Sequence, residues 1–442
     1  MRGFLRADAG RATLLAVLTT VAGLIALGAT VAFSHVLDED YGALVALFSA
    51  FFILAVPGQA LQTTVARDVS RAVAAGEPDP LGAVWVWLRG LAVVVLALAV
   101  ASLAVTGLSP GRSPIAATIG VEQEWAAATI LPAAAIWLML SVERGALQGM
   151  RRYGLVGGTM VGEHVARLVL GLGLYAAGLG VTGAFVGTTG AVVVMTAALA
   201  PVLSGHHVAG RAQVDGLRAL LGRAPAALGA LALFAVLQNV DVIVVQHMAT
   251  DAVSSAYAAA AVAAKAVIFV ATGLGLFLLP EAVRRTHAGN DARPVLAGSL
   301  LLIAVVAAPM VALYAVAGDT FLLHVFGAHR VSAAPALPWL GVAMTLLACA
   351  YLGMQYMLAL HDNRFLWLLG AAAVAQPLLM LAVGPHLTSL ALALVVLLGV
   401  LAAAVLWLSF RDAGRRLATG AAAPRPRHPA VAPPAHDARA LR

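Results

Sequence analysis

Two sets of ionisable residues lie inside long apolar stretches of the sequence, where they could do chemistry. Glu163 and Arg167, in VGEHVARLVLGLG, are four residues apart and share a helical face, with His164 turned about a third of the way round. A charged side chain within a membrane span costs about 2.5–3.5 kcal/mol, so it needs a partner or a watery cavity. Two interpretations stay open: an internal pair that neutralises itself, or a site where Arg167 attracts an anionic headgroup while Glu163 and His164 couple protons.

Asp241 and Lys265 form the second set. Asp241 lies in QNVDVIVVQH and Lys265 in AAVAAKAVIF, each twelve residues from Val253. If the two helices that meet near Val253 are antiparallel, the carboxylate and the ammonium group lie at nearly the same depth. Removing one partner of a buried pair costs about 3–5 kcal/mol, because the other charge is stranded. The pair is either structural or functional, with Asp241 binding a coupling cation or Lys265 contacting a substrate phosphate.

Membrane helices must position these charges, because 62% of the 442 residues are hydrophobic and only 11% are charged. A soluble domain has about 45–50% apolar and 25% charged residues. The net charge of +7 comes from arginines in short clusters between apolar runs, so no nucleic-acid partner is predicted. The sequence contains no P-loop, dinucleotide fingerprint, HExxH motif or nucleophile elbow, so neither an enzyme nor a metal site or organic cofactor is predicted.

Twelve segments are long and apolar enough to span a bilayer, which requires about 20 such residues. They are 12–33, 42–62, 86–106, 125–146, 155–177, 181–203, 226–246, 256–279, 295–317, 336–359, 365–383 and 388–410. The sequence therefore predicts an all-α integral membrane protein with about twelve transmembrane helices.

The distribution of basic residues predicts the orientation of these spans. Most arginines precede the first span or lie in the even-numbered connections and the tail, whereas the odd-numbered connections carry Arg112 and Arg330. The positive-inside rule then places both termini in the cytoplasm. The acidic residues Asp38, Glu39 and Asp40 fall in the first external turn, where Asp40 can cap the second helix.

A weak internal repeat divides the membrane part into halves. LDEDYGALVALF is echoed by TDAVSSAYAAAAVAAK, and the tyrosines of the two stretches, Tyr41 and Tyr257, are 216 residues apart. Parallel repeats related by an axis along the membrane normal occur in transporters whose substrate path lies between the halves.

These features predict four regions. An N-terminal six-helix bundle occupies 1–203, a cytoplasmic linker 204–225 and a C-terminal six-helix bundle 226–410. Residues 411–442 are rich in Pro, Ala and Arg and predict a disordered basic cytoplasmic tail.

Five stretches resemble sequences of a known family. They are HVLDEDYGALVALF, QTTVARDVSRAVAAG, ERGALQGMRRYG, NVDVIVVQHMATDAVSSAYAAAAVAAKAV and LHVFGAHR. On these stretches the chain resembles the multidrug/oligosaccharidyl-lipid/polysaccharide (MOP) flippase superfamily, and within it the polysaccharide transporter branch. The resemblance implies two six-helix bundles that open alternately to each side of a bacterial plasma membrane.

The resemblance also implies a function, the flipping of undecaprenyl-diphosphate-linked oligosaccharide from the inner to the outer leaflet. Arg167 and Lys265 are then the expected headgroup contacts, with Asp241, Glu163 and His164 in gating or coupling roles. The expected partners are the lipid-linked glycan, membrane lipids, and a polysaccharide polymerase or glycosyltransferases, and an H⁺ or Na⁺ gradient could supply the drive. Two alternatives remain: a cation-coupled multidrug exporter of the same fold, and a non-transporting scaffold whose tail recruits glycosyltransferases.

Overall fold

A computed structural model describes residues 2–204, 225–288 and 290–419, and every described secondary-structure element is a helix. Long apolar segments become helices in a membrane because the helix satisfies its own backbone hydrogen bonds where lipid offers no partner. The first half contains α1 (Arg2–Val36), η1 (Asp38–Asp40), α2 (Tyr41–Ala55), α3 (Pro57–Ala74), α4 (Gly82–Leu108), α5 (Pro114–Ile119), α6 (Glu124–Gly149), α7 (Tyr153–Leu174), η2 (Tyr175–Leu179) and α8 (Gly180–Ser204).

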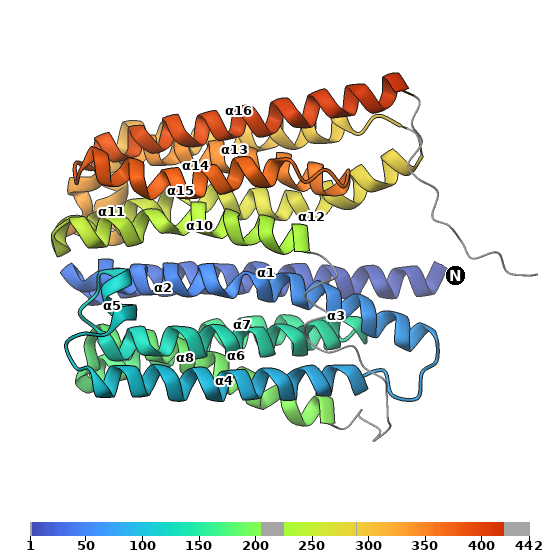
Figure 1. The fold of residues 1–442 in the computed structure, drawn as a ribbon, viewed down its shortest axis with the longest axis horizontal. Coiled ribbons are helices and arrows are strands. Elements are labelled where there is room, and N and C mark those ends of the chain that lie inside the picture. Colours follow the sequence, from blue (N-terminus) through green and yellow to red (C-terminus); the bar gives the residue numbers. More distant parts are fainter. Residues whose placement is uncertain (1, 205–224, 289, 420–442) are drawn as a thin grey trace, which may run out of the picture.

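The second half is built in the same way from long helices joined by short connections. It contains α10 (Pro225–Met248), α11 (Asp251–Ala264), α12 (Ala266–His287), α13 (Arg293–Phe326), η3 (Ala328–Ala333), α14 (Leu337–Ala359), α15 (Phe365–Val383) and α16 (Leu387–Thr419). Figure 1 shows the helices α1 to α8 gathered on one side of the molecule and α10 to α16 on the other. We call these groups the N-half and the C-half.

By length and composition, eleven stretches of the described residues could cross a membrane. One of them, Tyr153–Ser204, runs through α7, η2 and α8 and covers two of the segments that the sequence predicts as separate spans. It turns back at Gly178 and Gly180, whose φ values of 89° and 52° are ordinarily accessible only to glycine. The chain is thus an all-helical, multi-pass membrane protein in its described part, while the cytoplasmic location of the termini stays a prediction.

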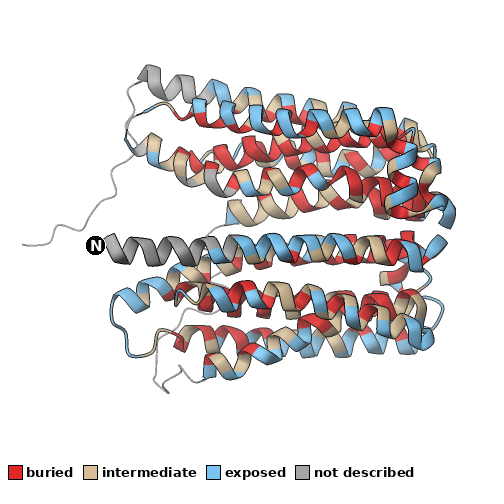
Figure 2. Cartoon of the chain, turned by 180° about the vertical axis from the view of Figure 1, so that it is seen from behind, coloured by how far each residue is buried: buried red, intermediate tan, exposed pale blue. Residues whose placement is uncertain are grey.

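The outer surface of both halves is apolar, as a lipid-facing surface must be. In the N-half Leu108 is 84% exposed, and in the C-half Val316 is 90% exposed and Trp367 is 84% exposed. Figure 2 shows the complementary pattern, with buried residues on the helix faces that point into each half. Since a soluble protein would not expose such side chains on every side, the exposure agrees with a lipid environment.

Several predicted boundaries need correction. The last described helix, α16, extends to Thr419, so residues 411–419 are helical and do not belong to a disordered tail. Residues 420–442 of the predicted tail and 205–224 of the predicted linker lie outside the described residues. The expected cap on α2 is also wrong, because the Asp40 side chain makes no capping hydrogen bond and instead belongs to the short 3-10 turn η1.

The two halves are joined by hydrogen bonds at the end of the molecule that carries η1 and η3, which we call the closed end. The Ser255 hydroxyl on α11 donates to the backbone oxygen of Glu39 and accepts from the backbone N–H of Gly42 at 2.8 Å. Gly42 allows this approach, because a Cβ there would collide with the Ser254 hydroxyl and lie only 2.8 Å from the side-chain oxygen of Gln246.

Candidate functional site

The N-half contains a buried cluster of two arginines around one glutamate. Glu163 and Arg167 share a face of α7, as their spacing predicts, and Arg167 Nη2 donates to Glu163 Oε1 at 2.7 Å. Arg144 reaches the same carboxylate from α6, with 3.0 Å between its Nη2 and Glu163 Oε2. The pair therefore does not neutralise itself, because one carboxylate serves two guanidinium groups. We call these three residues the arginine cluster.

Arg144 is held rigidly by further contacts. Its Nε donates to the Thr159 hydroxyl at 3.1 Å and its Nη2 to the Thr159 backbone oxygen at 2.9 Å. The guanidinium carbon also lies 5.5 Å from the ring centre of Trp137. Sequence patterns do not single out Arg144, because it lies in the last turn of the predicted span 125–146, where a basic side chain commonly reaches the interface.

Arg167 is held less completely than Arg144. Its guanidinium lies 5.8 Å from the ring centre of Phe48 on α2, and its side chain is 9% exposed. Its Nε is buried and has no hydrogen-bond partner among the described residues. Arg167 thus keeps an unused donor, which is what a group that contacts a passing anion requires.

Two further ionisable side chains lie beside the arginine cluster. His164 has a buried Nδ1 without a hydrogen-bond partner in the described part of the chain, and it forms no ion pair there with Glu163. Glu143 precedes Arg144 on α6 and is 2% exposed, and its Oε2 likewise has no partner among the residues described. The described hydrogen bonds of Arg144 go to Thr159 and Glu163, so Glu143 is a buried acid outside the ion pairs. The sequence prediction did not include Glu143 among the site residues.

The C-half contains the predicted pair of Asp241 and Lys265. Lys265 Nζ lies 3.3 Å from Asp241 Oδ1, and the Tyr257 hydroxyl donates to Asp241 Oδ2 at 3.1 Å. Asp241 is fully buried, and the Lys265 side chain is 9% exposed. We call these three residues the aspartate cluster, and each oxygen of its carboxylate has one donor.

Lys265 lies at a break between two helices. It is both the C-terminal cap of α11 and the N-terminal cap of α12, so the field at the end of α11 that favours a cation is opposed by the field at the start of α12. Asp241 comes from the neighbouring α10, at matching depth as the antiparallel arrangement predicts.

The structure thus brings the five predicted residues into two groups, one in each half. Glu163, Arg167 and His164 lie on α7, whereas Asp241 and Lys265 lie in the C-half. No ion pair between the two groups occurs among the described residues. Their proposed roles in binding and coupling stay predictions.

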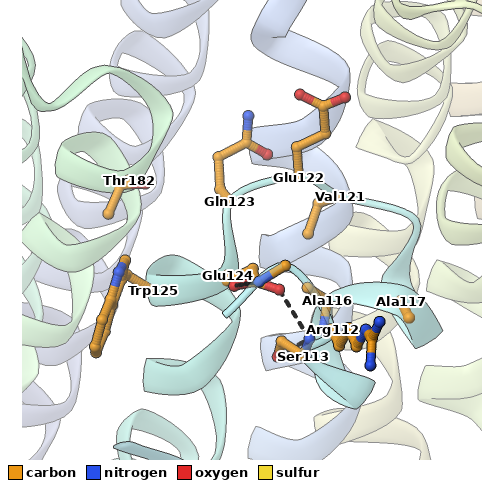
Figure 3. Close-up of a pocket in the computed structure, with 11 residues that line it drawn as sticks. Arg112, Ser113, Ala116, Ala117, Val121, Glu122, Gln123, Glu124, Trp125 and Thr182 are labelled. Atoms are coloured by element: carbon orange, nitrogen blue, oxygen red, sulfur yellow. Dashed lines mark hydrogen bonds between the residues drawn. The ribbon is translucent and has the colours of Figure 1, made fainter. Parts of the chain in front are cut away.

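A hollow of about 720 Å³ lies near α5 and the start of α6, away from both clusters. It is lined by Gly111, Arg112, Ser113, Ala116, Ala117, Val121, Glu122, Gln123, Glu124, Trp125 and Thr182 (Figure 3). Glu124 accepts hydrogen bonds from the backbone N–H groups of Gly111 at 2.9 Å and Ser113 at 2.8 Å, so its carboxylate holds the loop. Of the residues that line this hollow, none is a predicted site residue.

Comparison by sequence gives no match, either among protein-family models or among curated proteins. Comparison by structure does. An inward-facing MATE-family multidrug transporter of the MOP superfamily superposes with a TM-score of 0.71 at 15% identity, covering 94% of this chain and 100% of that one. The lipid II flippase MurJ in an inward closed conformation gives 0.71 at 13% identity, covering 92% and 90%. The eukaryotic MATE transporter AtDTX14 gives 0.62 at 15% identity, covering 94% and 100%. The chain therefore has the fold of the MOP-superfamily transporters.

Proposed function

We propose that this chain is a transporter that flips a polyprenyl-diphosphate-linked oligosaccharide from the inner to the outer leaflet of a bacterial plasma membrane. The observation that carries the proposal is the arginine cluster, in which Arg144 and Arg167 share the carboxylate of Glu163. An anionic diphosphate must be shielded from hydrocarbon on its way across, and buried guanidinium groups are well suited to this because they bind phosphate through paired N–H donors.

The division of labour follows from how each cation is held. Arg144 is fixed by Thr159 and Glu163, whereas Arg167 has an unused Nε, so Arg167 makes the first contact with the headgroup. Lys265 offers a second contact if the phosphate competes with Asp241 for its ammonium group. Asp241 would then be left with the Tyr257 hydroxyl, and it could take up a cation or a proton from a gradient.

The predicted orientation gives the closed end a role. With both termini in the cytoplasm, η1 and η3 face the outside, and the bonds between Ser255 and the first external turn close that side. Substrate would enter from the inner leaflet in this conformation. Alternating access then requires these bonds to break as the substrate leaves.

Deletion of the chain in its native cell tests the proposal. Lipid-linked sugars are extracted and the surface glycan is assayed. Accumulated polyprenyl-diphosphate oligosaccharide without surface glycan is the expected result, whereas normal levels of both would reject flipping. Complementation with Arg167→Ala should fail at near wild-type protein level, while Arg89→Ala, which changes an exposed arginine on α4, should restore export.

A cation-coupled multidrug exporter is the second candidate, and the fold supports it equally, since the MATE transporter and MurJ superpose with the same TM-score of 0.71. The fully buried Asp241 is the feature that favours it, because a carboxylate can bind a coupling cation. The same deletion strain distinguishes the two: altered sensitivity to cationic drugs with normal glycan would support export of drugs.

A scaffold that recruits glycosyltransferases or a polymerase through its basic tail would behave differently from either transporter. Removal of residues 420–442 leaves the described helices intact. Unchanged glycan export after this truncation would count against recruitment by the tail, and lost export with a normally inserted membrane part would favour it.

A further inference from the structure

Arg330 is a buried cation at the closed end, between the two halves. It lies in η3 and is 1% exposed. Its Nη2 donates to the backbone oxygen of Ser34 at 3.2 Å and to that of Asp38. Its guanidinium carbon lies 5.5 Å from the ring centre of Tyr41. A cation of the C-half is thus held by the last turn of α1, the turn η1 and the first residue of α2, all in the N-half.

Much of the hydrogen-bonding capacity of Arg330 is unused. Its Nε and Nη1 are buried and have no partner among the described residues, and the same is true of the Tyr41 hydroxyl. An arginine has five N–H donors, so three remain available when Nη2 has spent its two. In a guanidinium group the Nε–H points the same way as one Nη2–H, and one Nη1–H points the same way as the other Nη2–H. Either pair matches two oxygens of a phosphate once Nη2 leaves its carbonyl partners.

Nearby acids do not complete the site. The Asp38 carboxylate is 60% exposed and lies 3.8 Å from His329 Nε2, and Glu39 contributes its backbone oxygen to Ser255. Within the described chain no carboxylate forms an ion pair with Arg330. A buried guanidinium is ordinarily matched by an anion, and the contacts here are with carbonyl groups instead.

We propose that Arg330 is an anion site that binds a phosphate or diphosphate group when the closed end opens. Opening separates η3 from α1 and η1, which frees Nη2 from the carbonyl oxygens and exposes the remaining donors. The phosphate then takes the place of the carbonyl oxygens, with the Tyr41 hydroxyl as an additional donor. Because the anion binds the open form alone, it shifts the equilibrium toward that form. As the exit contact for a lipid diphosphate, this site rests on the proposed function.

The test measures the separation of the halves at the closed end. Spin labels are placed at the exposed Thr118 on α5 and Thr320 on α13, in full-length protein that carries Cys349→Ser and is held in phosphatidylcholine nanodiscs. Inorganic pyrophosphate is added at constant ionic strength. We expect it to increase the population with the longer distance in this background and to have no effect when Arg330→Gln is added. An equal response in Arg330→Gln would overturn the proposal.

Ser255→Ala is the matched control, because it removes another bond across the same contact without removing the cation. This variant should keep the pyrophosphate response, and its loss would mean that the response reports only a weakened closure. Gly42→Ala is included in case the closed end of the background protein is too stable to open. Its methyl group would displace Ser254 and Gln246 and so weaken the contact between the halves. No pyrophosphate response in either the background or Gly42→Ala would show that Arg330 only holds the halves together and would reject an anion site.

A second arm identifies the source of the phosphate. Nanodiscs that contain polyprenyl phosphate, without added pyrophosphate, should increase the open population through Arg330 if the ligand is a lipid headgroup. A response to pyrophosphate alone would keep the anion site and assign it to a free anion. This outcome is separable from the export test. Opening that depends on pyrophosphate in a chain that does not export glycan would reject the proposed flippase but keep the anion site. Glycan export without any effect of pyrophosphate on opening would reject the anion site but keep the flippase.

Discussion

The two halves have one architecture but handle buried charge differently. In the N-half one carboxylate, Glu163, serves two guanidinium groups, and the Arg167 Nε remains without a partner among the described residues. In the C-half one carboxylate, Asp241, receives one ammonium group and one hydroxyl, so each of its oxygens has a donor. The arginine cluster can therefore accept another anion, whereas the aspartate cluster is balanced and must exchange partners in order to act.

The predicted internal repeat would place this difference on related segments of the two halves. Ser255 bonds to Glu39, which lies 216 residues earlier, at the same offset that relates Tyr257 to Tyr41. Repeated segments close to an axis between the halves are expected to meet each other in this way. The charges do not follow the repeat, because the positions 216 residues after Glu163 and Arg167 are Leu379 and Val383.

The largest effect is expected from neutralising Glu163. Glu163→Gln leaves Arg144 and Arg167 buried without their shared counter-charge, so unfolding free energy should fall by about 3–5 kcal/mol. Thermal or denaturant unfolding in detergent micelles measures the loss. Glu143→Gln is the control on the neighbouring helix, and it should change stability by less than about 1 kcal/mol because Glu143 lies outside the described ion pairs. Equal losses in the two variants would contradict the description of the arginine cluster.

A double-mutant cycle sharpens the description of the aspartate cluster. Asp241→Asn and Lys265→Gln should each lower stability or transport, since each strands the other charge. The double change should recover part of the loss, with a coupling energy of about 0.5–3 kcal/mol. Strictly additive losses would mean that the two residues act independently, despite the 3.3 Å between their charged atoms.

The two repeat-related tyrosines give a smaller and directly comparable effect. Tyr257→Phe removes the hydrogen bond to Asp241 and should cost about 1.5–3 kcal/mol, the range for bonds to charged groups. Tyr41→Phe should cost little, because the Tyr41 hydroxyl has no partner among the described residues. Unfolding of the two variants under the same conditions checks this, and a larger loss for Tyr41→Phe would reverse the assignment.

The smallest effect comes from the partly exposed ion pairs of Glu281 with Arg284 and Arg285 in the C-half, which serve as a reference for the buried clusters. Hydrogen bonds from Arg284 and Arg285 lower the pKa of Glu281 to about 2. A carboxylate whose folded pKa is depressed stabilises the fold above its unfolded pKa, and this contribution is lost as the pH falls through the folded value. The slope of the unfolding free energy against pH should therefore be the same in Glu281→Gln and the wild type between about pH 5 and pH 8. Below about pH 4.5 the slope should be smaller in Glu281→Gln. A difference between the two proteins in the slope of the unfolding free energy against pH near neutrality would contradict this.

Sequence spacing could predict much of the fold and the pairs within one local segment. Apolar length predicts the helices, the four-residue spacing predicts the bond between Glu163 and Arg167, and depth symmetry about a turn predicts the bond between Asp241 and Lys265. These contacts depend on positions along one helix or one hairpin of helices, which the sequence contains directly.

Contacts that depend on how one helix is rotated against the next, or that join distant segments, could not be predicted in this way. Arg144 joins the arginine cluster because α6 turns one face toward α7, and a single sequence does not report that rotation. Arg330 bonds to Ser34, which lies 296 residues away, across the contact between the halves. The expected cap by Asp40 failed for a related reason: the turn that contains it is shaped by contacts with the C-half as well as by its local sequence.

The most direct measurement is flipping by the purified chain in proteoliposomes that contain a fluorescent polyprenyl-diphosphate oligosaccharide, read as the fraction exposed on the far leaflet. The wild type and Arg89→Gln, which alters an exposed arginine of α4, should flip the lipid, and Arg167→Gln should not. Flipping by Arg167→Gln at the wild-type rate would contradict the claim that the arginine cluster receives the diphosphate.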